Sequence, residues 1–346
     1  MTDDLKPLLA KIADGHIMSE KEAEQTFHLI MSGAAEPSQI AALLMGMRMR
    51  GERVNEIVGG ARVLRCKADR INAPSHSIDT CGTGGDSLGT YNISTTAAIL
   101  AASCGAVVAK HGNRSVSSKS GSADVLAALG INLDISQADN EACLREHGIA
   151  FMFAPSHHRA MRHVGPVRAS MGLRTLFNLL GPLANPAMTK RQLLGVFDKK
   201  WLRPMAETLR ALGSEKVWVV HGSDGLDEIT ITGESYIAEL KDGEIKEFTL
   251  NPQDVGLSPS PLVSIQGGSA DDNALAMRQL MQGEKGGYRD IVLLNAGATL
   301  LLADIAPTLK DGVTMAASAI DSGAMQQKFD DWAAFTQAHP IIDANS

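Results

Sequence analysis

The pattern of apolar and polar residues changes near residue 70. Up to that point, apolar side chains recur every three or four positions, which is the spacing of amphipathic helices. Ser19 and Glu22 also have the spacing of a capping box at a helix start. The pattern therefore predicts a small all-helical domain of four helices, which lie before Gly15, between Ser19 and Gly33, from Ser38 to Gly51 and from Asn55 to Lys67.

After Ile78, short apolar runs alternate with segments of helix length, which is typical of a mostly parallel sheet flanked by helices. The expected strands are residues 77–80, 106–109, 149–153, 192–197, 217–221 and 291–295. The expected helices between them include residues 93–103, 123–129, 136–147 and 204–212. The sequence thus predicts an α/β protein: a small all-helical domain plus a large α/β domain with a central, mostly parallel sheet.

Two irregular stretches refine this prediction. Residues 241–244, Lys-Asp-Gly-Glu, lie between two strand-like runs and predict a hairpin at 236–250. The segment from Gly165 to Pro186 is interrupted by proline and glycine, so we expect the chain to cross between the two domains there.

Composition narrows the possible classes of protein. The chain has 346 residues, of which 44% are hydrophobic and 21% charged, and this excludes a disordered or coiled-coil protein. Its net charge of −7 disfavours nucleic acid and anionic membranes as partners. Four cysteines without a C-x-x-C pair, an acidic N-terminus and no apolar run of bilayer length predict a soluble, cytoplasmic protein.

The first segment with candidate chemistry is Gly82-Thr83-Gly84-Gly85-Asp86, between a strand and the helix that begins near Ile93. Glycines at a strand end allow backbone N–H groups to converge on phosphate oxygens. The segment lacks the third glycine of a dinucleotide fingerprint and the Gly-Lys-Ser/Thr of a Walker A loop. A purely structural tight turn is the alternative.

The second segment, residues 110–122, also joins a strand to a helix. It contains three cations and five serines but no carboxylate, although the protein as a whole is acidic. Cations with short hydrogen-bond donors suit a polyanion. A surface loop is the alternative interpretation.

The third segment places Asp227 and Glu228 just after the strand at 217–221. Hard carboxylate oxygens of this kind bind Mg²⁺ together with substrate phosphates. Adjacent acids at a turn are often simply solvated, but two anion-binding loops favour a metal between them.

The fourth segment carries Arg162, Arg168 and Arg174 beside apolar residues. One of these arginines can hold a substrate carboxylate by two parallel hydrogen bonds, whereas the others suit helix ends or ion pairs. The neighbouring His157 and His158 have no metal-ligand spacing, and we expect them on a helix surface.

In this order and spacing, the segments resemble the anthranilate phosphoribosyltransferases of tryptophan biosynthesis, over nearly the whole chain. The motifs that carry the resemblance are Gly82-Thr83-Gly84-Gly85-Asp86, Asn92-Ile93-Ser94-Thr95, Lys110-His111-Gly112-Asn113-Arg114, Arg174-Thr175-Leu176-Phe177-Asn178 and Asp227-Glu228. Tyr91, where the family pattern has Phe, is a minor departure.

The resemblance implies a helical domain of residues 1–69 with roughly 165–190, and an α/β domain of residues 70–164 and 191–346. It implies a homodimer formed through the helical domain. It also implies the reaction: anthranilate and phosphoribosyl pyrophosphate give N-(5-phosphoribosyl)anthranilate and pyrophosphate, with two Mg²⁺ ions per subunit.

Site residues follow by motif position. The residues implied to bind phosphoribosyl pyrophosphate are Gly82, Gly85, Asp86, Thr90, Asn92, Ile93, Ser94, Thr95, Lys110, His111, Gly112, Asn113, Arg114, Ser115, Val116, Ser117, Ser118 and Ser122. Those implied to bind anthranilate are Gly82, Asn113 and Arg168, and those implied to hold Mg²⁺ are Ser94, Asp227 and Glu228. We assign no general acid or base, because the aromatic amine is unprotonated at neutral pH.

Two other functions remain open at this point. A pyrimidine nucleoside phosphorylase of related fold would also use glycine-rich and basic loops, but it should lack the paired carboxylates and a carboxylate-binding arginine. A non-catalytic paralogue that binds nucleic acid should be basic and should have lost the metal ligands.

Overall fold

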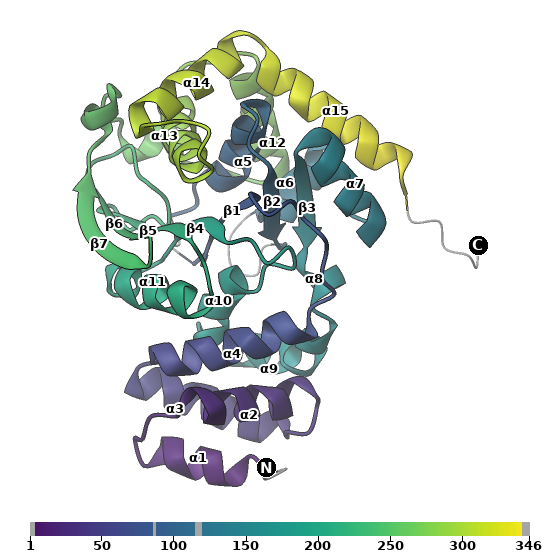
Figure 1. Cartoon of the computed structure of the whole chain (residues 1–346), viewed down its shortest axis with the longest axis vertical. Helices are drawn as coiled ribbons and strands as arrows, with labels where there is room; N and C mark the ends of the chain where they lie inside the picture. The colour runs from purple at the N-terminus through teal and green to yellow at the C-terminus, as the bar shows by residue number, and fades with distance from the viewer. Residues whose placement is uncertain (1–3, 86–87, 115–119, 341–346) are drawn as a thin grey trace.

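The computed structural model describes residues 4–85, 88–114 and 120–340. Its N-terminal part is a bundle of helices at one end of the molecule (Figure 1). The four predicted helices are confirmed as α1 (Lys6–Ala13), α2 (Glu20–Met31), α3 (Pro37–Arg50) and α4 (Val54–Lys67). The predicted capping box is present too, since Ser19 Oγ accepts the Glu22 N–H at 3.3 Å and the Glu22 carboxylate accepts the Ser19 N–H at 2.8 Å.

A seven-stranded sheet forms the centre of the larger part. Its strands are β1 (Ile78–Gly82), β2 (Val108–Gly112), β3 (Ile149–Phe153), β4 (Arg191–Gly195), β5 (Lys216–Gly222), β6 (Ser235–Lys241) and β7 (Glu244–Leu250). They are ordered β3-β2-β1-β4-β5-β6-β7, and the first five pair in parallel. The β6–β7 hairpin adds two antiparallel strands, and Asp242 and Gly243 take positive φ in its turn. The prediction of a mostly parallel sheet is confirmed.

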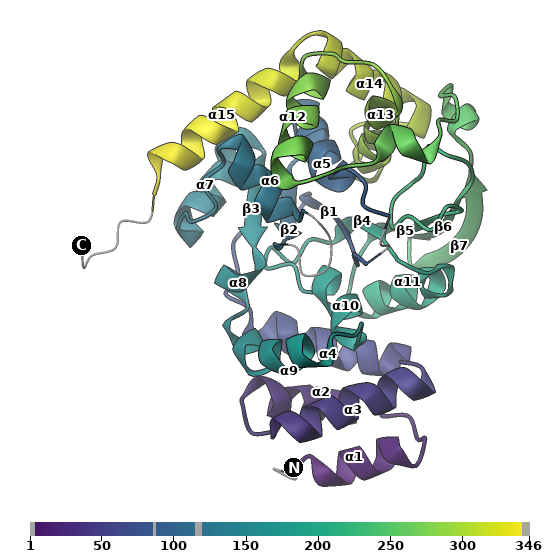
Figure 2. The same ribbon diagram turned by 180° about the vertical axis from the view of Figure 1, so that it is seen from behind.

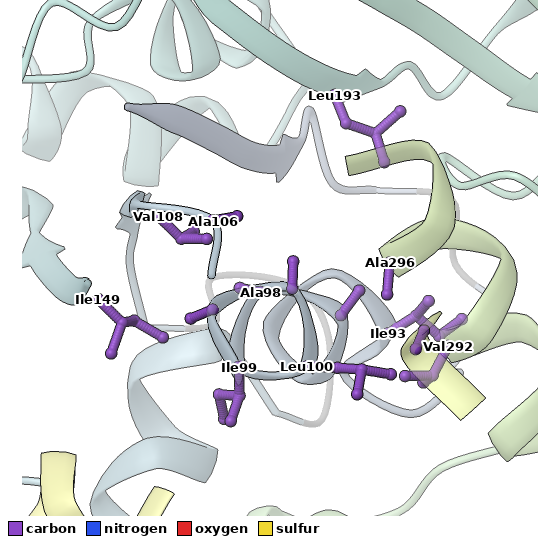
Figure 3. Close-up of a cluster of buried hydrophobic side chains, with 14 of the residues drawn as sticks. Ile93, Ala98, Ile99, Leu100, Ala106, Val108, Ile149, Leu193, Val292 and Ala296 are labelled. Atoms are coloured by element: carbon purple, nitrogen blue, oxygen red, sulfur yellow. The ribbon is translucent and has the colours of Figure 1, made fainter. Parts of the chain in front are cut away.

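One face of the sheet is covered by a layer of helices at the opposite end from the N-terminal bundle (Figures 1 and 2). The helices on this side are α5 (Ile93–Ser103), α6 (Ser122–Leu129), α7 (Gln137–His147), α12 (Ala270–Met281), α13 (Gly287–Leu302), α14 (Leu309–Asp321) and α15 (Ala324–Ala338). Figure 3 shows Leu100 of α5 beside Val292 of α13, in the same apolar cluster as Val108 of β2. This layer forms the larger of two apolar cores.

The second core lies on the other face. There, α11 (Leu202–Ala211) packs against β5 and against α4, so that apolar side chains continue from the sheet into the bundle. Residues alternate between faces along a strand: Trp218 and Val220 of β5 belong to the first core, and Val217 and Val219 to the second.

The middle of the chain packs against the helical bundle. It contains α8 (Ala154–His157), α9 (Gly165–Met171) and α10 (Leu176–Leu180). Helix α9 packs against α3, and α10 against α4. Short 3-10 turns occupy Arg159–His163, Gly181–Leu183, Lys199–Trp201, Pro252–Val255 and Leu262–Ile265.

The predicted strand at residues 291–295 is wrong, because these residues lie inside α13. The run from Ile291 is apolar on nearly every side since α13 is buried between α5 and α14. A fully buried helix has no polar face, so its sequence lacks the alternation of apolar and polar residues that marks a helix. Only the length of α13, sixteen residues, distinguishes it from a strand. Helices α12, α14 and α15 were not predicted. Within the described ranges, no helix is both long and apolar enough to cross a bilayer.

Candidate active site

The candidate segments meet in one cavity of about 330 Å³ at the carboxyl ends of β1 and β2. Predicted residues that line it are Gly82, Gly85, Thr90, Asn92, Ile93, Ser94, Thr95, Lys110, His111, Gly112, Asn113, Arg114, Ser122, Asp227 and Glu228. The other residues predicted to bind phosphoribosyl pyrophosphate lie outside the described residues: Asp86, Ser115, Val116, Ser117 and Ser118. Strand ends are where ligands bind in open α/β sheets, because the connections from neighbouring strands converge there.

Glycines at the strand ends allow the loop with Asp227 to pack closely. A Cβ on Gly82 would lie 2.4 Å from Asp227 Oδ2, and one on Gly195 would lie 1.5 Å from the Asp227 carbonyl oxygen. Any side chain at either position would push the loop away. The two glycines therefore place the Asp227 carboxylate against the end of β1.

Both carboxylates of the pair accept hydrogen bonds from the candidate anion-binding segments. Asp227 Oδ2 accepts the Gly84 N–H at 2.7 Å, and Glu228 Oε1 accepts the Ser94 N–H at 3.1 Å. Ser94 is in the first turn of α5, where the helix presents its positive end. The acidic pair thus joins the glycine loop to the start of α5.

Lys110 brings a positive charge into the floor of this cavity. Its side chain is buried, and its Nζ donates to the Thr80 carbonyl and lies 3.5 Å from Ser94 Oγ. Next to it, Asp79 accepts the His111 N–H at 3.1 Å, and burial raises the pKa of the Asp79 carboxyl. Lys110 thus hydrogen-bonds to a carbonyl and a hydroxyl, and its charge also acts on the buried Asp79 carboxyl.

The donor set fits Mg²⁺, which is bound by one or two carboxylates with substrate phosphates and water completing its octahedron. Asp227, Glu228 and Ser94 offer hard oxygen atoms on one wall of the cavity. In the part of the chain that the structure describes, no three His, Cys, Asp or Glu side chains cluster as an all-protein metal site. The residues therefore suit a metal that arrives with a phosphorylated ligand.

A second cavity, of about 500 Å³, adjoins the first and shares His111 and Asn113 with it. Arg168 lines this cavity, with its guanidinium carbon 5.4 Å from the centre of the Phe177 ring. Burial lowers the pKa of the Arg168 guanidinium. Of the three residues predicted to bind anthranilate, Arg168 and Asn113 line the second cavity, and Gly82 lines only the first.

The prediction that His157 and His158 lie on a helix surface is wrong. Both are buried, not on a helix surface, and His158 lines the second cavity beside His111, with 5.1 Å between the two ring centres. Burial lowers the pKa of His158 to about 4 and that of His111 well below its usual value. The cavity wall is thus lined by neutral imidazoles at neutral pH. Arg162, which sequence reasoning interpreted as structural, also lines this cavity.

Two residues of the site were missed by the sequence analysis as individual contributors. Asn178 of α10 lines the first cavity, and Arg174 Nη1 donates to the Gly85 carbonyl at 2.8 Å. Both belong to the stretch that returns to the helical bundle, so no local pattern linked them to the glycine loop. The family motif that contains them was the available signal.

Comparison with known proteins agrees with this architecture. Two family models match the chain: "Glycosyl transferase family, helical bundle domain" over residues 6–68 and "Glycosyl transferase family, a/b domain" over residues 74–326. The fold and the two matched models thus define a glycosyl transferase of the class that combines these two parts.

Curated relatives identify the group within that class. The anthranilate phosphoribosyltransferase of Azorhizobium caulinodans is 54% identical over 98% of this chain and 99% of its own. The anthranilate phosphoribosyltransferase of Parvibaculum lavamentivorans is also 54% identical, over 94% of this chain and 95% of its own. The chain belongs to the anthranilate phosphoribosyltransferase family, and this favours a phosphoribosyltransferase over a pyrimidine nucleoside phosphorylase or a nucleic-acid-binding paralogue.

Solved structures share the whole fold. The crystal structure of anthranilate phosphoribosyltransferase from Thermus thermophilus superposes with a TM-score of 0.89 at 42% identity, covering 95% of this chain and 99% of that one. The Saccharomyces cerevisiae enzyme, solved in complex with phosphoribosyl pyrophosphate (PRPP) and Mg, superposes with a TM-score of 0.88 at 24% identity. The match covers 96% of this chain and 98% of that one.

Proposed function

We propose that this chain transfers the 5-phosphoribosyl group of phosphoribosyl pyrophosphate (PRPP) to the amine of anthranilate and releases pyrophosphate. The observation that carries the proposal is the junction of the two cavities at Asn113 and His111. One cavity has the cations, backbone donors and carboxylates that suit PRPP with a metal. The other has Arg168 against aromatic and apolar side chains, which suits an aromatic carboxylate.

The reaction is a substitution at C1 of the ribose. The nitrogen lone pair of anthranilate forms the new C–N bond while the C1–O bond breaks, and that bonding pair leaves with pyrophosphate. The residues that stabilise this departing charge are Lys110 and Arg114. Arg168 holds the carboxylate of anthranilate so that the amine faces the first cavity at Asn113. The extra proton on nitrogen is lost after the bond forms, so no strong base is required.

Mg²⁺ would be held by Asp227, Glu228 and the hydroxyl of Ser94, with two ions per subunit. When bound, the metal neutralises charge on the pyrophosphate group. The remaining PRPP ligands that we propose are Gly82, Gly85, Asp86, Thr90, Asn92, Ile93, Thr95, Lys110, His111, Gly112, Asn113, Arg114, Ser115, Val116, Ser117, Ser118 and Ser122. Anthranilate would contact Gly82 in addition to Asn113 and Arg168.

The helical unit, residues 1–69 with roughly 165–190, is the proposed dimer interface. Met45 and Met49 lie one turn apart on α3, and Met49 is 75% exposed. Helix α3 packs on α9, and Leu173, just beyond α9, is exposed as well. Neighbouring exposed apolar side chains mark surfaces that another chain covers. A second copy fits, because a two-fold interface uses the same patch on both subunits.

A cytoplasmic location is part of the proposal. Cys66, Cys81, Cys104 and Cys143 are all unpaired, and burial raises the pKa of Cys143 to about 12. Thiols that stay reduced are usual in reducing compartments.

The proposed function is tested by mixing the purified protein with Mg²⁺, PRPP and anthranilate and following the loss of anthranilate fluorescence. Parallel reactions contain a pyrimidine nucleoside with phosphate, or labelled single-stranded nucleic acid. The proposal expects turnover of anthranilate only. Phosphorolysis of the nucleoside, or tight nucleic-acid binding without turnover, would favour one of the two alternatives.

A further inference from the structure

The glycine loop is held from two opposite sides at adjacent residues. The Gly84 N–H donates to Asp227 Oδ2 at 2.7 Å, and the Gly85 carbonyl accepts from Arg174 Nη1 at 2.8 Å. Gly84 and Gly85 have φ of +65° and +82°, the left-handed region that glycine adopts at little cost. Two successive residues of this kind are easily displaced unless other groups fix them. The loop conformation therefore depends on Asp227 and Arg174.

Arg174 is itself fixed by two further contacts. Its guanidinium carbon lies 4.6 Å from the centre of the Phe197 ring, and its backbone carbonyl accepts from Arg48 Nη1 on α3. A guanidinium is planar, and its contact with the ring restricts the directions in which Nη1 can point.

Phe197 is anchored to the same glycine loop. Its N–H donates to Thr83 Oγ1 at 3.0 Å, and the Thr83 N–H donates to the Gly195 carbonyl at 2.9 Å. The contacts form a closed ring from Thr83 through Phe197 and Arg174 to Gly85. Phe197 therefore fixes the position of Arg174 relative to the end of β4. Arg174 in turn fixes the position of Gly85, at the far end of the glycine loop.

Arg174 has little structural role elsewhere. The residue is exposed and borders an open cavity of about 630 Å³ between the α3–α4 turn and Phe197. Truncating its side chain enlarges a space that already exists, so the fold should lose little stability. The contact to Gly85 is then the main one that depends on the guanidinium.

We propose that Arg174 is a positioning residue for PRPP: it holds the Gly85 carbonyl so that the glycine loop, whose Gly84 N–H is held by Asp227, keeps the shape that it presents to PRPP in the first cavity. The inference rests on the proposed function, since the loop must bind PRPP for its order to matter. Arg174 itself need not touch the substrate. A loop that is already ordered loses no conformational entropy when the substrate binds. If the loop became disordered, the affinity for PRPP would therefore fall.

The test compares Arg174→Ala and Arg174→Lys with wild type and with Arg203→Ala, an exposed arginine that pairs with Glu207 and Glu247 far from the loop. We expect Arg174→Ala to raise KM and Kd for PRPP by about tenfold and to change KM for anthranilate less than about twofold. Lysine keeps the charge but not the planar stacking, so its effect should be intermediate. Added methylguanidine should recover part of the PRPP affinity of the alanine variant. Arg203→Ala should match wild type.

Hydrogen exchange of the free proteins gives a readout that does not depend on turnover. The amides of residues 83–85 should exchange faster in Arg174→Ala than in wild type, with melting temperatures that agree within about 2 °C. An unchanged KM and Kd for PRPP in Arg174→Ala would overturn the inference, as would equal losses for both substrates together with a lower melting temperature. If wild type itself fails to consume PRPP and anthranilate, the proposed function fails, whereas the exchange result still decides whether Arg174 orders the loop.

Discussion

Asp227 Oδ2 accepts a hydrogen bond from the Gly84 N–H at 2.7 Å, across 143 residues of sequence. A carboxylate proposed to hold a metal thus also contacts the loop proposed to bind pyrophosphate. On the other side of the pair, Glu228 accepts the Ser94 N–H at 3.1 Å. The acidic pair therefore joins the proposed metal site to the glycine loop and to the start of α5.

The double variant Asp227→Asn with Glu228→Gln tests this link. Both new side chains keep their shape and can still accept from the Gly84 and Ser94 N–H groups, but they carry no charge for Mg²⁺. Turnover should fall by at least about two orders of magnitude, and PRPP should bind weakly. Titration calorimetry with PRPP and Mg²⁺, beside steady-state rates, provides the measurement. Near-normal rates in this variant, or in wild type with excess chelator, would remove the metal assignment.

Gly85→Ala should weaken PRPP binding. A Cβ there would lie 3.3 Å from Arg174 Cδ, and φ is +82°. Gly105→Ala is the matched control, because Gly105 has φ +96° and an added Cβ meets nothing within 4 Å. Both variants pay a similar backbone cost of about 1–2 kcal/mol. Calorimetry should show lower PRPP affinity for Gly85→Ala alone, and equal affinities would make the loop a structural turn only.

Arg168→Ala should raise KM for anthranilate by about one to two orders of magnitude, since a hydrogen-bonded charged pair contributes about 1.5–3 kcal/mol. KM for PRPP should change much less. Arg145→Ala, on the exposed side of α7, serves as the control. Kinetics with each substrate varied in turn decide the matter: an unaltered dependence on anthranilate contradicts the role of Arg168.

Stability should fall as the pH drops from 7 to 5. Burial lowers the pKa of His158 to about 4 in the folded protein, whereas the unfolded chain has an ordinary histidine near 6.5. Below about pH 6.5 the unfolded state binds a proton that the folded state does not, which costs about 2 kcal/mol of stability at pH 5. Urea unfolding at pH 7 and pH 5 should show that the free energy of unfolding falls less for His158→Gln than for wild type. The exposed control His76→Gln should keep the wild-type slope.

Met49→Glu should convert a dimer into a monomer, because it places a charge in the proposed interface. Val263→Glu is the control, since Val263 is 70% exposed but lies on the 3-10 turn Leu262–Ile265, outside the helical unit. Sedimentation equilibrium gives the mass of each. A monomeric wild type, or a dimeric Met49→Glu protein, would contradict an interface on α3.

The parts of the site that sequence could predict are those with a local signal. The glycines after β1, Lys110 in β2 and Asp227 after β5 each follow a recognisable strand, and parallel strands bring those ends together. Arg174 has no such signal, because its contact with Gly85 joins residues 89 apart through a return of the chain to the helical bundle. Helix α13 was missed for a related reason: burial on all sides removed the polar face that reveals a helix.

The central claim, that the two cavities hold PRPP and anthranilate for one substitution, is tested most directly by reaction stoichiometry. Pyrophosphate release and anthranilate consumption are measured in the same reaction with Mg²⁺, and the product is weighed by mass spectrometry. The account predicts one pyrophosphate per anthranilate consumed and a single product with the mass of phosphoribosyl anthranilate. Pyrophosphate released without loss of anthranilate, or no release with both substrates present, would contradict it.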